Sequence, residues 1–190
     1  VVYNFRKNDI NNGGQGAPLT PVFHKLLSNK LNIKPVTFIN IGGIVNKTTV
    51  SNKDNNLFAT DIGPGMCLVD KWIRSNSENR YDKDGLIARS GKINKIILDQ
   101  AVDNFFKNSE ISGLKNINDN EQVKSFDTKD FDGSFVDKLS LEDGAATLTE
   151  FSIQIMLPFL NLAKKNKEKI ILCGGGRKNL FLIDRIKKKN

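Results

Sequence analysis

The stretch VTFINIGGIVNKTTV, residues 36–50, decides the fold of this chain. Two runs rich in β-branched residues meet at Gly42 and Gly43, which predicts two antiparallel strands joined by a tight glycine turn. We expect positive φ angles at the turn, and the missing Cβ atoms would let a ligand approach the backbone. Asn40 and Asn46 flank the turn, so amide side chains and bare N–H groups would converge on one phosphate-sized anion. An ordinary hairpin with a glycine turn is the alternative.

Two further glycine loops follow strand-like segments. Residues 57–60 run into Asp61-Ile62-Gly63-Pro64-Gly65, and a helix is predicted over 66–74. A carboxylate and a helix N-terminus would then share one site, which favours an anion and a Mg²⁺ ion held through water. Residues 170–173 form another predicted strand, which ends in Gly174-Gly175-Gly176. Strand, glycines and helix in this order are typical of a nucleotide site. Close packing of the helix on the strand is the alternative.

The first 35 residues carry a fourth glycine-rich loop. They are predicted to open with a strand, VVYNF, and to reach a loop at residues 13–16. A helix follows from Pro21, because proline is tolerated in a first turn. His24 lies on the apolar side of that helix and is predicted to be packed rather than catalytic. Asp9 stands just before the glycines, where its carboxylate either faces a bound ligand or caps the turn.

The remaining elements follow from hydrophobic periodicity. A polar loop is expected over residues 76–91, and an amphipathic helix over 93–106. Residues 107–132 are rich in Asn, Asp and Lys and are predicted to be irregular. Ser140 begins a long helix as a near capping box, and residues 145–163 are apolar on most sides and therefore buried.

Composition narrows the classes of protein. The chain has 190 residues, and no apolar run approaches the ~20 residues of a membrane span. The net charge of +8 raises nucleic acid as a partner, but the lysines are scattered without interleaved aromatics, so we expect none. Cys67 and Cys173 lie far apart and the chain has one His, which predicts free thiols and no metal site made of side chains. The missing initiator Met and an end inside a predicted helix indicate a partial chain.

Glycine loops at several strand ends, with acidic residues beside two of them, predict a phosphate-transferring or nucleotide-hydrolysing protein. The sequence contains no GxxxxGK[ST] motif, so it is not a P-loop NTPase, and it lacks the protein-kinase signatures.

Six segments, in order, carry a resemblance to a known family: GGQGAPLTPVFH (13–24), INIGGIVN (39–46), TDIGPGMCLVD (60–70), DGLIARSG (84–91), LSLEDGAATLTEF (139–151) and LCGGGRKN (172–179). Over nearly its whole length the chain resembles anhydro-N-acetylmuramic acid kinases. The resemblance implies an α/β fold, an actin-like ATPase (ribonuclease H-like) lobe with a mixed five-stranded sheet flanked by helices. Residues 1–35 would be the end of the first lobe and the crossing between lobes. Residues 36–190 would be most of the second, nucleotide-binding lobe.

The resemblance also implies an activity. The family uses ATP and Mg²⁺ to open 1,6-anhydro-N-acetylmuramic acid with water and to phosphorylate O6, giving N-acetylmuramate 6-phosphate in peptidoglycan recycling. It implies a cytoplasmic enzyme, a small-molecule sugar as partner and a homodimer. The competing hypothesis is an actin-like nucleotide-binding ATPase or kinase with a different substrate, since a fold alone does not fix a function.

Site residues carry over from the family by position. Asp9 resembles the general base that activates the attacking water, a role worth about 10²–10⁴-fold in rate. The resemblance also implies three groups of cofactor-binding residues. The phosphate-binding hairpin contributes Asn40, Gly42, Gly43 and Asn46, and a second loop near phosphates, Mg²⁺ or sugar contributes Asp61, Gly63 and Gly65. The adenosine-side loop contributes Gly174, Gly175, Gly176 and Asn179.

The sequence departs from the family pattern at several points. Asn4 stands where the family usually carries Asp, and Lys47 replaces an apolar residue. KSFDTKDF (124–131) replaces a Ser-Thr-Gly-Arg-Glu stretch, which leaves the role of that segment open. The family's N-terminal Gly-Thr-Ser phosphate loop and its C-terminal acidic substrate contact are not in these residues. We therefore expect this chain alone to be inactive.

Overall fold

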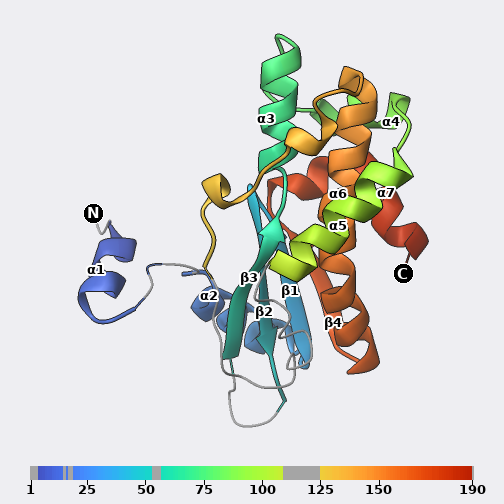
Figure 1. The fold of residues 1–190 in the computed structure, drawn as a ribbon. Helices are drawn as coiled ribbons and strands as arrows, with labels where there is room; N and C mark the ends of the chain where they lie inside the picture. Colours follow the sequence, from blue (N-terminus) through green and yellow to red (C-terminus); the bar gives the residue numbers. More distant parts are fainter. Residues whose placement is uncertain (1–3, 15, 17–18, 53–56, 109–124, 190) are drawn as a thin grey trace.

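A four-stranded mixed sheet forms the centre of the molecule in the computed structural model, which describes residues 4–14, 16, 19–52, 57–108 and 125–189 (Figure 1). The strands are β1 (Val36–Ile41), β2 (Ile44–Val50), β3 (Leu57–Pro64) and β4 (Lys169–Cys173), in the order β3-β2-β1-β4. Neighbours among β1, β2 and β3 are antiparallel, and β4 runs parallel to β1. The predicted hairpin over residues 36–50 is confirmed.

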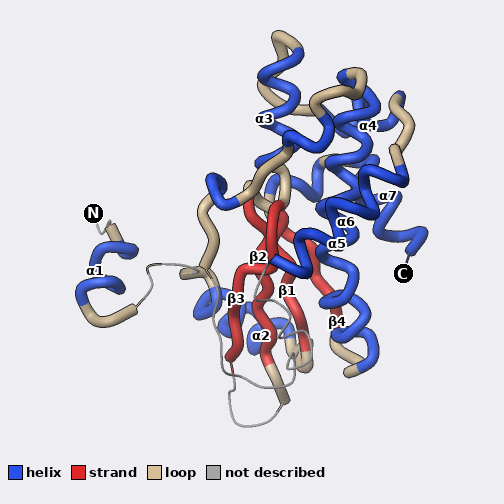
Figure 2. Tube along the Cα trace, in the orientation of Figure 1, coloured by secondary structure: helices blue, strands red, loops and turns tan. Residues whose placement is uncertain are grey.

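Helices cover both faces of the sheet (Figures 1 and 2). They are α1 (Phe5–Asn11), α2 (Pro21–Leu31), α3 (Cys67–Asn76), α4 (Leu86–Ser90), α5 (Lys95–Asn108), α6 (Leu141–Lys165) and α7 (Leu180–Lys189). Helix α2 packs against β2 and β3 on one face, and α6 packs against β3 and β4 on the other. Among the described helices, none combines the length and the apolarity needed to cross a bilayer.

Alternation along the first two strands separates two hydrophobic clusters. Ile39, Ile41 and Val45 are fully buried in the large cluster that contains α6. Phe38 belongs to a smaller cluster beneath α2, on the opposite face. His24 from α2 stacks on the Phe38 ring, with centroids 4.4 Å apart, and burial lowers the pKa of this histidine. The prediction of a packed histidine is confirmed.

The 25-residue helix α6 is the main support of the sheet. Ser140 caps it as predicted, since its hydroxyl accepts the Asp143 N–H. The Trp72 indole N–H donates to the Leu141 carbonyl at 2.9 Å and so joins α3 to the start of α6. A Cβ at Gly144 would lie 2.4 Å from the Trp72 ring, so this glycine permits the close approach.

A buried ion network holds the last helix against α6. Glu150, with 1 % of its surface exposed, accepts from the Arg185 Nε at 2.7 Å and the Lys189 Nζ at 2.9 Å. Gln154 Nε2 donates to the same carboxylate. Helix α7 follows directly after the triple-glycine loop, so this network fixes the element that carries the loop.

Lys47 stands where the family resemblance implies an apolar residue, and the structure buries most of it. Its side chain is 7 % exposed, and its Nζ lies 5.3 Å from the Phe58 ring centroid and 5.6 Å from that of Phe159. Burial lowers the pKa of this lysine, an effect that Glu168 partly opposes. Cation–π contact with two rings therefore accounts for a cation at this position.

Several sequence predictions need correction. The described residues form a four-stranded sheet, so the five-stranded sheet is not confirmed, and Phe5 of the expected opening strand begins helix α1. The other expected strand residues before Asn4 lie outside the described residues. Asp61 to Pro64 continue strand β3 instead of forming a loop, because they pair with β2 across an irregular register between Val45 and Asn46.

The polar loop expected over residues 76–91 contains a short helix, α4. The buried Asp82 carboxylate accepts the N–H groups of Ile87 and Ala88 and organises its first turn. Cys67 and Cys173 are free thiols as predicted, but both are half-buried rather than buried.

Candidate functional site

Three loops meet at one edge of the sheet. Strands β1, β3 and β4 run in the same direction, so the turn after β1, the end of β3 and the loop after β4 share the carboxyl edge (Figure 1). Most of the predicted site residues lie there, on segments far apart in the sequence. This edge is where open α/β sheets bind their ligands.

Backbone hydrogen bonds tie the first two of these loops together. The Gly42 carbonyl accepts the Met66 N–H at 2.9 Å, and the Gly43 carbonyl accepts from Gly65 at 2.9 Å and Cys67 at 3.1 Å. Ser152 of α6 donates its hydroxyl to the Gly65 carbonyl at 2.7 Å. These amides at the start of α3 therefore fix the hairpin turn and are not directed at an anion, which corrects the role expected for this helix N-terminus.

Some of the predicted site glycines are required by packing. Gly174 has a φ of 85°, and a Cβ there would lie 2.5 Å from the Ile41 carbonyl oxygen. A Cβ at Gly176 would lie 2.4 Å from Ile41 Cγ2, and one at Gly65 would lie 2.4 Å from the Gly42 carbonyl oxygen. At Gly63 it would lie 2.8 Å from Ile155 of α6. Close packing therefore accounts for these four glycines, although the sequence offered that alternative only for the triple-glycine loop.

Gly43 and Gly175 behave differently. A Cβ at Gly43 would make only ordinary contacts, the nearest at 3.7 Å from Thr128 Cγ2, and a Cβ at Gly175 would meet nothing within 4 Å. Neither residue has a positive φ, and neither does Gly42, so the left-handed turn expected at the hairpin is wrong. The hairpin instead closes with Gly42 N–H donating to the Ile44 carbonyl at 3.2 Å. What Gly43 and Gly175 offer is bare backbone at the edge.

A row of polar side chains crosses the sheet beside these glycines. Asn40 pairs with Asn46 across β1 and β2, and Asn46 pairs with Asp61 across β2 and β3. Asn40 lies between two glycine loops, since its Oδ1 would be 2.6 Å from a Cβ at Gly174. Asn46 Oδ1 is buried without a partner among the described residues. Amide groups in this row suit a polar ligand better than an apolar one.

Asp61 is the buried carboxylate of this row. It is 8 % exposed, and its Oδ2 accepts the Phe126 N–H at 2.9 Å. Burial raises the pKa of Asp61, and the Phe126 hydrogen bond partly opposes that shift. The predicted second loop therefore places its carboxylate inside the protein rather than at the open edge.

Asn179 lies behind the triple-glycine loop. It is 4 % exposed, and its Oδ1 accepts the Leu182 N–H at 2.9 Å at the start of α7. The same oxygen would be 2.1 Å from a Cβ at Gly85, which brings the α4 turn against the loop. Asn179 thus supports the loop from its buried side.

Asp9 is not brought to the sheet edge. Its Oδ2 accepts the Gly16 N–H at 2.7 Å, and its carbonyl accepts the Gly14 N–H at 2.8 Å. Helix α1, which carries it, stands apart from the sheet (Figure 1). In this conformation Asp9 caps the glycine-rich loop, which is the structural alternative considered for it.

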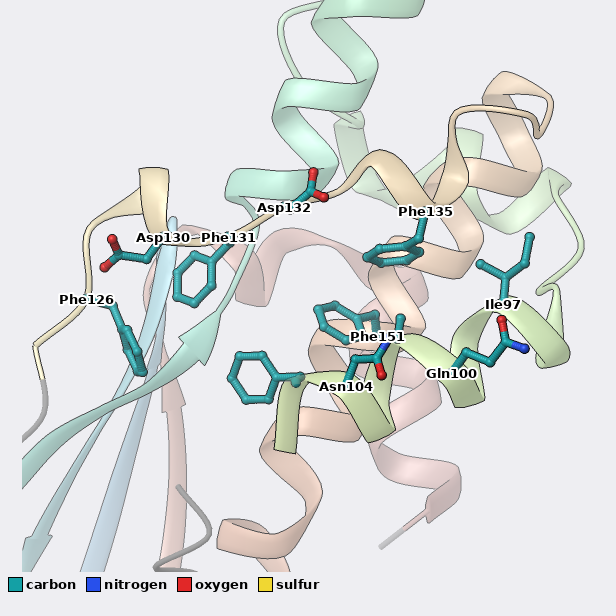
Figure 3. A pocket seen from close by; sticks show the side chains of 11 residues that line it. Ile97, Gln100, Asn104, Phe126, Asp130, Phe131, Asp132, Phe135 and Phe151 are labelled. Carbon is teal, nitrogen blue, oxygen red and sulfur yellow. The ribbon is translucent and has the colours of Figure 1, made fainter. Parts of the chain in front are cut away.

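A cavity of about 670 Å³ beside the site was not predicted. It lies between α5, α6 and the segment after residue 125, and Figure 3 shows aromatic rings together with amide and carboxylate groups around it. Its rings are those of Phe105, Phe126, Phe131, Phe135 and Phe151. Part of its sequence signal is the phenylalanine spacing of FDTKDFDGSF, residues 126–135, which overlaps the region 107–132 predicted to be irregular.

Comparison with known proteins identifies the family of this chain. The family model for anhydro-N-acetylmuramic acid kinase matches residues 1–189. The chain belongs to the anhydro-N-acetylmuramic acid kinase family. An anhydro-N-acetylmuramic acid kinase of Pelagibacter ubique is 49 % identical over the whole chain and 49 % of its own length. Those of Zymomonas mobilis and Rhizobium etli are 36 % and 35 % identical over 96 % of the chain and 47 % of their own lengths. The chain thus spans about half the length of these curated relatives.

The residues at the edge fit the phosphate chain of the ATP that a kinase family uses. Gly43 and Gly175 leave space that a Cβ would fill, and Asn40 places an amide between their two loops. For Mg²⁺ the fit is poorer, since the described residues hold no group of three or more side chains suited to a metal ion. Asp61 is the carboxylate of the row, and one of its oxygens is already bonded to Phe126.

Gly43→Ala is expected to weaken ADP binding about tenfold or more while leaving stability within about 1 kcal/mol. The added methyl group meets only ordinary contacts inside the protein. It would, however, occupy the space through which we expect a phosphate oxygen to approach the backbone. Loss of one hydrogen bond to a charged group corresponds to about 1.5–3 kcal/mol. Calorimetric titration with ADP and urea unfolding measure the two quantities.

Gly133→Ala is the matched control for this change. A Cβ there also meets only ordinary contacts, 3.4 Å from Leu68 and 3.7 Å from Leu148, but it lies away from the edge. Unchanged ADP binding in Gly43→Ala, or a loss of the same size in both variants, would contradict a phosphate site at the hairpin.

Proposed function

We propose that this chain is the nucleotide-binding half of an ATP-dependent kinase that opens 1,6-anhydro-N-acetylmuramic acid with water and phosphorylates O6. The observation that carries the proposal is the contrast among the glycines of the sheet edge. Gly174, Gly176 and Gly65 are held by packing, whereas Gly43 and Gly175 present bare backbone to the space in front of the strand ends. Family membership supplies the sugar substrate, since the relatives are named for it.

The edge residues would act by positioning and by charge. Asn40, Asn46 and the Gly42–Gly43 turn bind the β- and γ-phosphates from one side, and the Gly174–Gly176 loop, supported by Asn179, binds the nucleotide from the other. Phosphoryl transfer to O6 depends on in-line alignment rather than on a protein nucleophile. Mg²⁺ would neutralise charge on the phosphates, and we propose that it enters with ATP rather than in a cage of side chains.

Asp9 is proposed as the general base for the ring-opening water, on the family resemblance alone. Its carboxylate now accepts the Gly16 N–H, so catalysis requires Asp9 and its glycine loop to lie against the sugar. We also propose, from the same resemblance, a cytoplasmic homodimer that serves peptidoglycan recycling. The competing function is an ATPase or kinase on the same fold with another substrate.

Mass analysis of the product tests this proposal in the complete protein that carries the chain. With Mg-ATP and 1,6-anhydro-N-acetylmuramic acid, we expect a product heavier than the sugar by one water and one phosphoryl group. Asp9→Asn should lower the rate by about 10²-fold or more, because the amide cannot accept the proton from water. A rate of ADP formation that does not depend on the sugar and is unchanged in Asp9→Asn would favour the competing function.

A further inference from the structure

The segment Ser125–Asp132, here called the strap, runs from the end of β3 past the glycine edge toward α6. Figure 3 shows Phe126, Asp130, Phe131 and Asp132 along it. The Phe126 N–H donates to Asp61 Oδ2 at 2.9 Å, which joins the strap to the polar row of the sheet. The strap overlaps residues 124–131, whose role the family resemblance leaves open.

Asp61 is poorly placed to bind a ligand directly. Only 8 % of the residue is exposed, and one carboxylate oxygen is committed to the Phe126 N–H. A carboxylate in direct contact with Mg²⁺ or sugar needs an open face and free oxygen lone pairs. Burial of this group is instead typical of a residue that organises neighbouring backbone, since a buried carboxylate is stable only with hydrogen-bond donors around it.

The strap is braced by hydrogen bonds among residues 127–130 and by ring contacts of its two phenylalanines. Asp127 Oδ1 accepts the Lys129 N–H at 3.0 Å, and Asp130 Oδ2 accepts the Asp127 N–H at 2.7 Å, which together form a capping box. The Phe131 ring is 9 % exposed and packs 5.2 Å from the Phe126 ring and 6.5 Å from that of Phe105.

Thr128, at the centre of this braced segment, reaches the hairpin turn. Its Cγ2 lies 3.7 Å from the position of a Cβ on Gly43, closer than any other atom outside the turn. The strap therefore forms one wall of the space in front of Gly43. A shift of the strap would move this wall relative to the bare backbone that we assign to a phosphate.

We propose that Asp61 is a positioning residue of the nucleotide site, which acts by holding the Phe126 N–H and thereby setting the strap against the Gly42–Gly43 turn. Its carboxylate does not contact the nucleotide or its metal ion. Thr128 of the strap instead forms the wall of the space in front of Gly43. This inference rests on the proposed function, because it takes the turn as the phosphate site.

The test compares Asp61→Ala with Asp61→Asn in the complete protein. The asparagine keeps an oxygen acceptor of the same size without the charge, whereas the alanine removes the acceptor. We expect Asp61→Ala to speed amide exchange at Phe126 about tenfold to hundredfold and to raise the KM for ATP more than it lowers kcat. Asp61→Asn should keep the amide exchange at Phe126 and the KM for ATP close to those of the unsubstituted protein. Asp99→Ala, an exposed carboxylate on α5, is the control and should change neither.

Equal losses of kcat in Asp61→Asn and Asp61→Ala, with unchanged exchange in the strap, would overturn the inference and assign Asp61 a direct role through its charge. Thr128→Ala provides a second route if Asp61→Ala does not fold, because this exposed residue can be trimmed without touching Asp61. It should weaken ADP binding about twofold to tenfold, and unchanged binding would also overturn the inference. If the complete protein without any substitution binds no ADP, the proposed function is refuted, and the inference with it.

Discussion

Replacing Gly174 with alanine is expected to lower the free energy of unfolding by about 3 kcal/mol. Gly174 adopts φ 85° and ψ 174°, a region that residues other than glycine essentially never occupy and that costs about 1–3 kcal/mol. The new methyl group would also lie 2.5 Å from the Ile41 carbonyl oxygen and 2.6 Å from Asn40 Oδ1, and such overpacking costs a further ~1–3 kcal/mol. Both costs fall on the loop that holds β1 against β4.

Urea unfolding followed by Trp72 fluorescence measures this loss, because Trp72 is the single tryptophan and is 8 % exposed. Gly175→Ala is the matched control, since the neighbouring glycine has no atom within 4 Å of its Cβ position and no positive φ. Equal stability of the two variants would contradict the conformation assigned to this loop.

Glu150→Ala is expected to cost about 3 kcal/mol, because it removes the buried carboxylate that accepts hydrogen bonds from the partly exposed cations Arg185 and Lys189. A hydrogen bond to a charged group contributes about 1.5–3 kcal/mol. The exposed ion pair between Arg89 and Asp184 is the control, because Asp184 lies on α7 next to Arg185. Asp184→Ala should cost much less, as exposed pairs contribute little. Urea unfolding of both variants provides the comparison, and similar losses would show that the Glu150 network does not hold α7.

The same network makes stability depend on pH. Burial would raise the pKa of Glu150, but hydrogen bonds from Arg185 and Lys189 outweigh it and hold the pKa below its ordinary value. A carboxyl group with a lower pKa in the folded state stabilises the protein above the unfolded pKa of about 4.3, and this contribution is lost as the pH falls through the folded value. Between pH 7 and pH 3 the unchanged protein should therefore lose more stability than Glu150→Gln. Parallel pH profiles would contradict this account.

Local patterns predicted the elements that local physics determines. Strand alternation over residues 36–50 gave the hairpin, and the Ser140 cap gave the start of α6, because both depend on neighbours in the sequence. His24 was correctly predicted to be packed, since its helix face is apolar. The convergence of the glycine loops was not predicted; it depends on the common direction of β1, β3 and β4, which end at one edge.

Long-range contacts account for what the sequence did not predict. Glu150 is a single acid within the apolar stretch over residues 145–163, and its cationic partners, Arg185 and Lys189, follow it by 35 and 39 residues in the sequence. The hairpin glycines suggested positive φ, but neither Gly42 nor Gly43 has one, and the hairpin closes with the Gly42 N–H donating to the Ile44 carbonyl. Nothing local could separate Gly43 from Gly174, because only the packing of β4 beside β1 determines which glycine is open and which is filled.

Hydrogen–deuterium exchange with and without ADP tests the central claim most directly, namely that the two glycine loops of the sheet edge hold the phosphate chain. In the complete protein, with binding verified by calorimetry, we predict slower exchange at residues 40–46 and 174–176 and little change at the exposed end of α5. Bound ADP that leaves both loops unprotected, or that protects only the phenylalanine cavity between α5 and α6, would contradict it.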